Sequence, residues 1–148
     1  MVIGVGNPLR GDDGVGAAVV RRLRTRVWPG VAVRELDGDG TALMEQWSGA
    51  AAVVVVDAMV SGAAPGTIAR FDAVREPLPA GAFHLSTHAL GLSDAIELAR
   101  AMEALPPSLI VYGVEGEGFD AGAPLSAAVA AAVPVVAERI AREIAAAV

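Results

Sequence analysis

The chain has 148 residues, enough for one domain with a substantial core, and a formal charge of −6 at neutral pH. It contains no cysteine, and all 11 of its basic residues are arginine. These absences exclude disulfides, thiol proteases, cysteine metal sites and catalysis by lysine. Because 54% of the residues are apolar and only 4% are aromatic, we expect one domain, residues 1–148, with an aliphatic core.

The distribution of charge argues against nucleic acid and membrane partners. Arg21, Arg22, Arg24 and Arg26 form a dense basic cluster, which is more typical of a solvated helix face than of a nucleic-acid site. The apolar run Ala50–Val56 is too short to cross a bilayer. With no secretory pattern at its start, the chain is expected to be cytoplasmic.

The first half of the chain alternates strand and helix patterns. Met1–Val5 is a short apolar run that predicts a strand. From Gly14 to about Val27, apolar residues recur every fourth position, which predicts a helix. Val31–Leu36 alternates apolar and charged residues, as a strand near a sheet edge does, and Thr41–Trp47 reads as a short helix.

The second half continues this alternation. Val53–Val56 is a β-branched run typical of a strand buried on both faces, and Asp57 ends it. The later predicted elements are a strand at Gly66–Phe71, a loop at Glu76–Phe83, a helix from Ser86 and Thr87 to about Leu105, a strand at Leu109–Val114 and a helix over Ser126–Val148. This order predicts an α/β fold, with a mainly parallel sheet of about five strands covered on both faces.

The glycine-rich turn from Gly4 to Gly16 carries adjacent carboxylates at Asp12 and Asp13. The turn matches neither of two common phosphate-binding motifs. A dinucleotide-binding fingerprint needs a glycine at the position of Leu9, and a P-loop needs a lysine that the turn lacks. The turn is thus a candidate cation site. Alternatively, Asp12 caps the following helix and Asp13 complements its dipole, and Asp12→Asn then costs about 1 kcal/mol or less.

Three side chains are candidates for one site. Asp13 follows the first strand and Asp57 ends the central strand, so both border the crevice where ligands bind in open α/β sheets. His88 is expected at a helix start, where the dipole favours the neutral imidazole. We expect all three to converge at the carboxyl edge of the sheet, close enough to share one divalent ion.

Each candidate also has a structural interpretation. His88 is alternatively a capping residue, and Asp57 a hydrogen-bonding group of a loop. His84 is a rival ligand, although its place in the preceding loop makes it the weaker candidate. Asp37 and Asp39 are expected to stabilise their own turn, and Asp37 also ends a strand, from which it could join the site.

Several motifs together resemble the hydrogenase maturation proteases. They follow the family's order and span nearly the whole chain, at Gly4–Leu9, Gly11–Gly16, Leu36–Thr41, Val56–Val60, Pro65–Thr67 and Ser86–Leu92. The resemblance implies a three-layer α/β/α fold and an endopeptidase that removes the C-terminal extension of a nickel-loaded [NiFe] hydrogenase large-subunit precursor. It also implies that Asp13, Asp57 and His88 are catalytic and contact the metal, and that no organic cofactor is needed.

The sequence leaves the mechanism and two rival functions open. No nucleophile motif of a known protease class is present, so hydrolysis must use water. Either a metal held by the three residues activates that water, or the three residues hold the substrate's nickel and a carboxylate acts as base. The rivals are a non-catalytic metal-binding chaperone that docks on a metalloprotein precursor and, by fold analogy alone, a nucleotide-binding domain.

Overall fold

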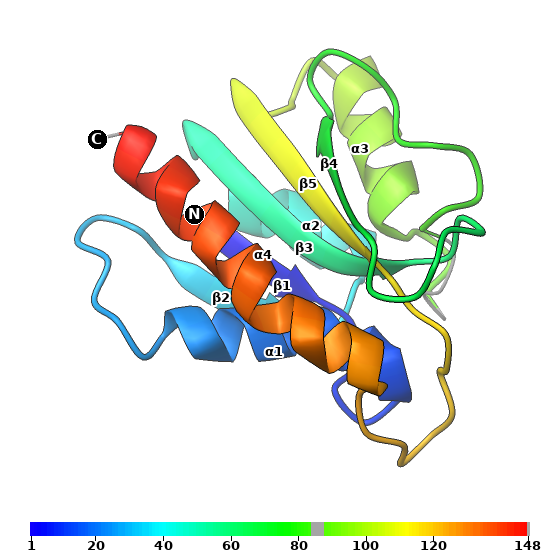
Figure 1. Ribbon diagram of the computed structural model, residues 1–148. Coiled ribbons are helices and arrows are strands. Elements are labelled where there is room, and N and C mark those ends of the chain that lie inside the picture. The colour runs from blue at the N-terminus through cyan, green and yellow to red at the C-terminus, as the bar shows by residue number, and fades with distance from the viewer. Residues whose placement is uncertain (84–87, 148) are drawn as a thin grey trace.

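The computed structural model describes residues 1–83 and 88–147, which form a five-stranded sheet between two helical layers (Figure 1). The strands are β1 (Val2–Val5), β2 (Val33–Leu36), β3 (Ala52–Met59), β4 (Ile68–Asp72) and β5 (Ser108–Glu115). The helices are the 3₁₀ turn η1 (Gly11–Gly14), α1 (Val15–Leu23), α2 (Gly40–Trp47), α3 (Leu92–Ala101) and α4 (Ala127–Ala146). The expected α/β/α fold with a mainly parallel sheet is confirmed.

The strand order β2-β1-β3-β5-β4 creates a switch point in the centre of the sheet. β1 pairs in parallel with β2 on one side and with β3 on the other. β3 and β5 are also parallel, whereas β4 runs antiparallel to β5 at the edge. The chain therefore winds to one side after β1 and returns to the other, which leaves a crevice at the carboxyl ends of β1 and β3.

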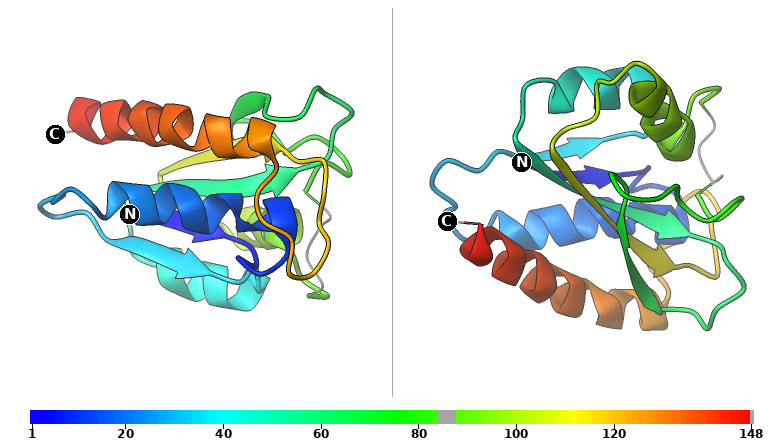
Figure 2. Two further views of the ribbon diagram at one scale, coloured as in Figure 1. Left: turned by 60° about the horizontal axis from the view of Figure 1, so that its bottom comes forward. Right: turned by 90° about the horizontal axis from the view of Figure 1, so that it is seen from above.

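Each face of the sheet is covered by one pair of helices (Figure 2). Side chains alternate along β3, so Val53 and Val55 belong to the apolar cluster under α2 and α3. Val56 points the other way, into the cluster under α1 and α4 that includes Val19 and Ile140. Both faces of the central strands are thus buried, as their continuous apolar runs predict.

Gly16 lets α1 lie directly on the backbone of the switch point. A β-carbon at Gly16 would stand 2.5 Å from the backbone nitrogen and oxygen of Val5 and 2.6 Å from the backbone oxygen of Val56. No side chain fits at such distances. The helix that follows the glycine turn is therefore held against the ends of both β1 and β3.

Two elements of the predicted pattern have different bounds. α1 ends at Leu23 rather than near Val27, because the Leu23 carbonyl accepts hydrogen bonds from the Trp28 indole and from the Arg26 N–H. β3 continues to Met59, because its pairing with β5 extends to that residue. Asp57 therefore lies inside β3, immediately beyond the last residue that pairs with β1.

The helix expected from Ser86 and Thr87 begins later, at Leu92, and ends at Ala101. Gly91 precedes it in an extended conformation, and the Gly91 N–H donates to the Asp94 carboxylate. The carbonyl of Leu90 accepts from the Gly40 N–H at the start of α2. These contacts keep Leu90 and Gly91 outside the helix, because their backbone groups bind elsewhere.

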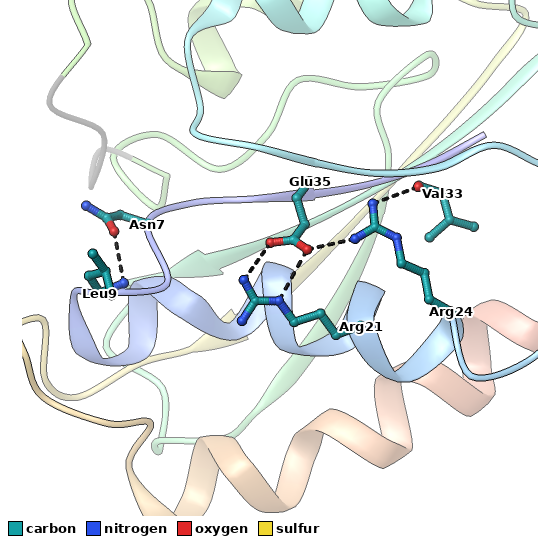
Figure 3. Close-up of polar contacts among 6 residues, drawn as sticks. All are labelled: Asn7, Leu9, Arg21, Arg24, Val33 and Glu35. Atoms are coloured by element: carbon teal, nitrogen blue, oxygen red, sulfur yellow. Dashed lines mark hydrogen bonds and ion pairs between the residues drawn. The ribbon is translucent and has the colours of Figure 1, made fainter.

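The basic cluster lies partly against the sheet edge. Arg21 of α1 and Arg24, which follows that helix directly, both donate to the Glu35 carboxylate of β2, at 2.8 to 3.2 Å (Figure 3). Arg24 also donates to the Val33 carbonyl. Half of the cluster thus ties α1 to β2 across a solvent-facing edge.

Across the part of the chain that is described, no helix is both long enough and apolar enough to cross a membrane.

Candidate active site

A cavity of about 320 Å³ opens at the carboxyl ends of the central strands. Its lining comes from the ends of β1, β2 and β3, from the glycine turn and from the residues that lead into α3. The described lining residues are Val5, Gly6, Asn7, Arg10, Asp13, Asp37, Gly38, Asp57, His88 and Leu92. Asp13, Asp57 and His88 therefore face the same crevice, where the switch-point argument places them.

The glycine turn fixes Asp13 through its own backbone. The Asn7 side-chain oxygen accepts from the Leu9 N–H at 2.9 Å (Figure 3). In return, the Asn7 N–H donates to Oδ2 of Asp13 at 2.8 Å. Gly6 has φ 127°, and a β-carbon there would strike the Asp13 carbonyl. The turn thus closes on itself and holds the Asp13 carboxylate at the mouth of the crevice.

Asp13 and Asp57 form a pair of carboxyl groups with raised pKa values. Burial raises the pKa of Asp13, and its hydrogen bond from Asn7 and the charge of Arg10 only partly oppose this. Burial also raises the pKa of Asp57 well above its usual range, and the charge of Asp13 raises it further. A hydrogen bond at 2.8 Å from the Ala58 N–H opposes the shift of Asp57. Two buried carboxyl groups that repel each other favour a proton or a cation between them.

His88 lies against Asp37. Its Nε2 is 3.3 Å from Oδ2 of Asp37, while Oδ1 of Asp37 accepts from the Asp39 N–H. Asp39 has a different task, because its carboxylate caps α2 through the Thr41 N–H. Asp37 therefore stabilises its own turn and also lines the cavity. The expectation that His88 stands at a helix start is wrong, since α3 begins at Leu92.

The three candidates line one cavity without forming a ready-made metal cluster. Within residues 1–83 and 88–147, no three His, Asp or Glu side chains are arranged to hold an ion. The rival ligand His84 lies outside the described residues.

The prediction that Asp12 caps a helix is wrong. Asp12 is only 1% exposed, and its carboxylate accepts from the backbone N–H groups of Glu117, Gly118 and Ser126 and from the Ser126 hydroxyl, at 2.7 to 3.2 Å. Burial alone raises the pKa of Asp12, but these hydrogen bonds outweigh it and lower the pKa. Asp12 thus ties the glycine turn to the loop that follows β5, a contact between residues distant in sequence.

Sequence reasoning missed the roles of two polar residues, one that lines the cavity and one that holds the loop after β3. Arg10 lines the cavity, and its position inside the glycine turn was a signal for this. Glu115 is 2% exposed at the end of β5, where its carboxylate accepts from the N–H groups of Ser61 and Ala63. Glu115 holds the loop after β3. Glu115 and Asp57 both follow a buried apolar run in the sequence, and nothing in the sequence separates their two roles.

The sequence profile described as hydrogenase maturation protease matches residues 17–143. The chain belongs to the hydrogenase maturation protease family. Its sequence is 36% identical over 124 residues to the hydrogenase expression/formation protein HoxM of Azotobacter vinelandii, covering 81% of this chain. It is 35% identical over 125 residues to the hydrogenase 2 maturation protease of Escherichia coli, covering 81% of this chain and 74% of that protein.

Solved structures of this family share the fold. The hydrogenase maturating endopeptidase HybD of E. coli superimposes with a TM-score of 0.80 at 26% identity, covering 99% of this chain and 91% of that one. The chain spans 59% of the length of the Azotobacter protein and a similar share of several other curated relatives.

Proposed function

We propose that this hydrogenase maturation protease family member is an endopeptidase. Its substrate is a [NiFe] hydrogenase large-subunit precursor already loaded with nickel, from which it removes the C-terminal extension. Asp13, Asp57 and His88 contact the substrate's nickel. The observation that carries the proposal is the cavity at the switch point, which is lined by two buried carboxyl groups with raised pKa values and by an imidazole.

The donor set suits a borderline divalent ion. Two carboxylate oxygens and an imidazole nitrogen are hard-to-borderline ligands of the kind that nickel accepts. A cation at this position also relieves the repulsion between Asp13 and Asp57, which desolvation intensifies. His88 lies within 3.3 Å of the Asp37 carboxylate, and such a partner orients a ligating imidazole.

Water is the nucleophile in this proposal. None of the described lining residues is a serine, threonine, cysteine or lysine. A carboxylate with a raised pKa is a better proton acceptor than an ordinary one, so Asp13 or Asp57 takes the proton from the attacking water. Contact of the three residues with the substrate's nickel positions one peptide bond beside that water.

Nickel in the substrate then acts as the specificity signal. In this proposal, specificity does not depend on a pocket for a substrate side chain, since the described lining combines polar groups with only two apolar side chains, Val5 and Leu92. Because the enzyme recognises an ion that is already bound in the precursor, it cleaves only precursor that has received its metal. Precursor without nickel should therefore resist the enzyme.

The decisive experiment incubates the protein with nickel-loaded and metal-free precursor and measures both masses by mass spectrometry. We expect one cut near the C-terminus of the loaded precursor and none in the metal-free one. The Asp57→Asn variant should leave both intact. Equal processing of metal-free precursor in the presence of a chelator would rule out nickel recognition. Tight binding of loaded precursor with no loss of mass would favour the metal-binding chaperone instead.

A further inference from the structure

Arg10 is the one cationic side chain among the described lining residues that carries a permanent charge. Its guanidinium makes no hydrogen bond or ion pair with the described residues. Other arginines near carboxylates are engaged: Arg21 and Arg24 bind Glu35, and Arg70 binds Glu143. Arg10 is therefore a strong donor that the fold leaves free inside the cavity.

The backbone of Arg10 is held firmly although its side chain is not. The Arg10 N–H donates to the Asn7 carbonyl at 3.1 Å, and the Arg10 carbonyl accepts from the Asp13 N–H at 3.1 Å. The next N–H, that of Gly11, donates to the Ala123 carbonyl. Bonds on both sides thus fix the Cα of Arg10 at the cavity, so only the side chain needs to move toward a substrate.

Arg10 forms no ion pair with the acids around it, as far as the described residues show. The cavity contains three carboxyl groups, yet none pairs with Arg10 within 4.0 Å. Asp13 binds the Asn7 N–H, Asp37 lies against His88, and Asp57 binds the Ala58 N–H. The charge of Arg10 does lower the pKa of Asp13, but burial outweighs it and the net pKa stays raised.

The proposed hydrolysis places a new negative charge in this acidic cavity. When water attacks the scissile carbonyl carbon, the carbonyl electron pair moves to its oxygen and forms an oxyanion. Neighbouring carboxylates disfavour that charge, so its stabilisation requires a fixed positive group or donor. Among the described lining residues, Arg10 has both the permanent charge and the unused N–H groups.

We infer that Arg10 binds the carbonyl oxygen of the scissile peptide bond and stabilises the oxyanion that forms there. This role rests on the proposed endopeptidase function. The water oxygen bonds to the carbonyl carbon, and its proton passes to Asp13 or Asp57. Collapse of the oxyanion then breaks the C–N bond, and the leaving amine takes up the proton. Arg10 donates hydrogen bonds throughout and neither gains nor loses a proton.

The first test compares kcat and KM for cleavage of nickel-loaded precursor by wild type, Arg10→Gln and Arg10→Lys. Loss of an oxyanion donor lowers kcat by about 100- to 1000-fold, so Arg10→Gln should show that fall with KM changed only a few-fold. Arg10→Lys keeps the charge and should recover part of kcat. Arg139→Gln is the matched control, because it removes an exposed arginine of α4, and it should cleave as wild type does.

A second test uses chemical rescue. Added guanidinium, below denaturing concentration, should raise the cleavage rate of Arg10→Ala but not that of Asp57→Asn. A purely structural role for Arg10 gives no rescue, and it also lowers the unfolding midpoint of the Arg10 variants. Unaltered kcat in Arg10→Gln, or a rise in KM alone, would overturn the oxyanion role. Failure of the wild-type protein to cut loaded precursor would instead reject the endopeptidase function itself.

Discussion

Nε2 of His88 lies 3.3 Å from Oδ2 of Asp37, and both side chains line the cavity at the carboxyl ends of the central strands. Asp37 is itself held, because its other oxygen accepts from the Asp39 N–H. A carboxylate in this position orients the ring and increases its basicity as a ligand. The pair joins the end of β2 to the connection before α3.

Removal of the Asp37 carboxylate should weaken cleavage without unfolding the protein. We expect Asp37→Asn to lower kcat/KM for nickel-loaded precursor by about 10- to 100-fold, as losses of such partners do at metal sites. Asp39→Asn is the matched control, because asparagine caps α2 as well as aspartate does. If both variants cleave at the wild-type rate, the contact between Asp37 and His88 has no part in the reaction.

Asp57→Asn should stabilise the metal-free protein while abolishing cleavage. A carboxyl group whose pKa is raised on folding contributes stability that is fully present below its unfolded pKa, 3.8, and is lost as pH rises through the folded pKa. Asparagine stays neutral and keeps an oxygen for the Ala58 N–H. The variant should therefore be more stable than wild type at about pH 7.5, with the difference shrinking toward about pH 3.

Urea unfolding of the metal-free proteins at both pH values measures this difference. Asp120→Asn provides the control, since it removes an exposed carboxylate from the loop after β5. If Asp57→Asn were less stable than wild type at neutral pH, the fold would stabilise the charged Asp57 carboxylate rather than disfavour it.

Asp12→Asn should act on stability, and more strongly than a helix cap would. The Asp12 carboxylate accepts four hydrogen bonds from residues 117–126, and an amide oxygen cannot satisfy all of these donors. We expect the free energy of unfolding to fall by about 1.5–3 kcal/mol. Ser126→Ala removes only one of the four bonds and should cost about 1 kcal/mol.

The effect of Asp12→Asn on the free energy of unfolding depends on pH in the opposite direction to the effect of Asp57→Asn. The pKa of Asp12 is lowered in the folded protein, so its contribution is present above the unfolded value of 3.8 and is lost as pH falls through the folded pKa. The stability gap between wild type and Asp12→Asn should therefore narrow in acid. A gap that widened in acid would contradict the hydrogen-bonded carboxylate.

Gly16→Ala should disrupt the packing of α1 on the switch point. Its β-carbon would meet backbone atoms of Val5 and Val56, which cannot move aside as a flexible side chain can. We expect a loss of about 2–3 kcal/mol in the free energy of unfolding, measured by chemical denaturation. Gly118→Ala is the control, because a β-carbon there has no neighbour within 4 Å. Equal stability of the two variants would show that α1 is free to shift.

The sequence by itself determined the elements and their layering. Continuous apolar runs at β3 and β5 and the four-residue periodicity of α1 are local signals, so they predict a central parallel sheet covered by helices. The switch point followed from chain order, and it placed Asp13 and Asp57 at one edge of the sheet. These predictions succeed because a strand's carboxyl end is fixed by its direction alone.

Only the tertiary structure decided what each polar residue contacts. The residues around Asp12 give no sign that its carboxylate binds a loop more than 100 residues later in the chain. The late start of α3 likewise depends on the bond between Leu90 and Gly40 of a different helix. Packing across the crevice buries Asp13 and Asp57 beside each other and leaves Arg10 without an ion pair among residues 1–83 and 88–147. Hydrogen bonds and desolvation act through space, so residues distant in the sequence set them.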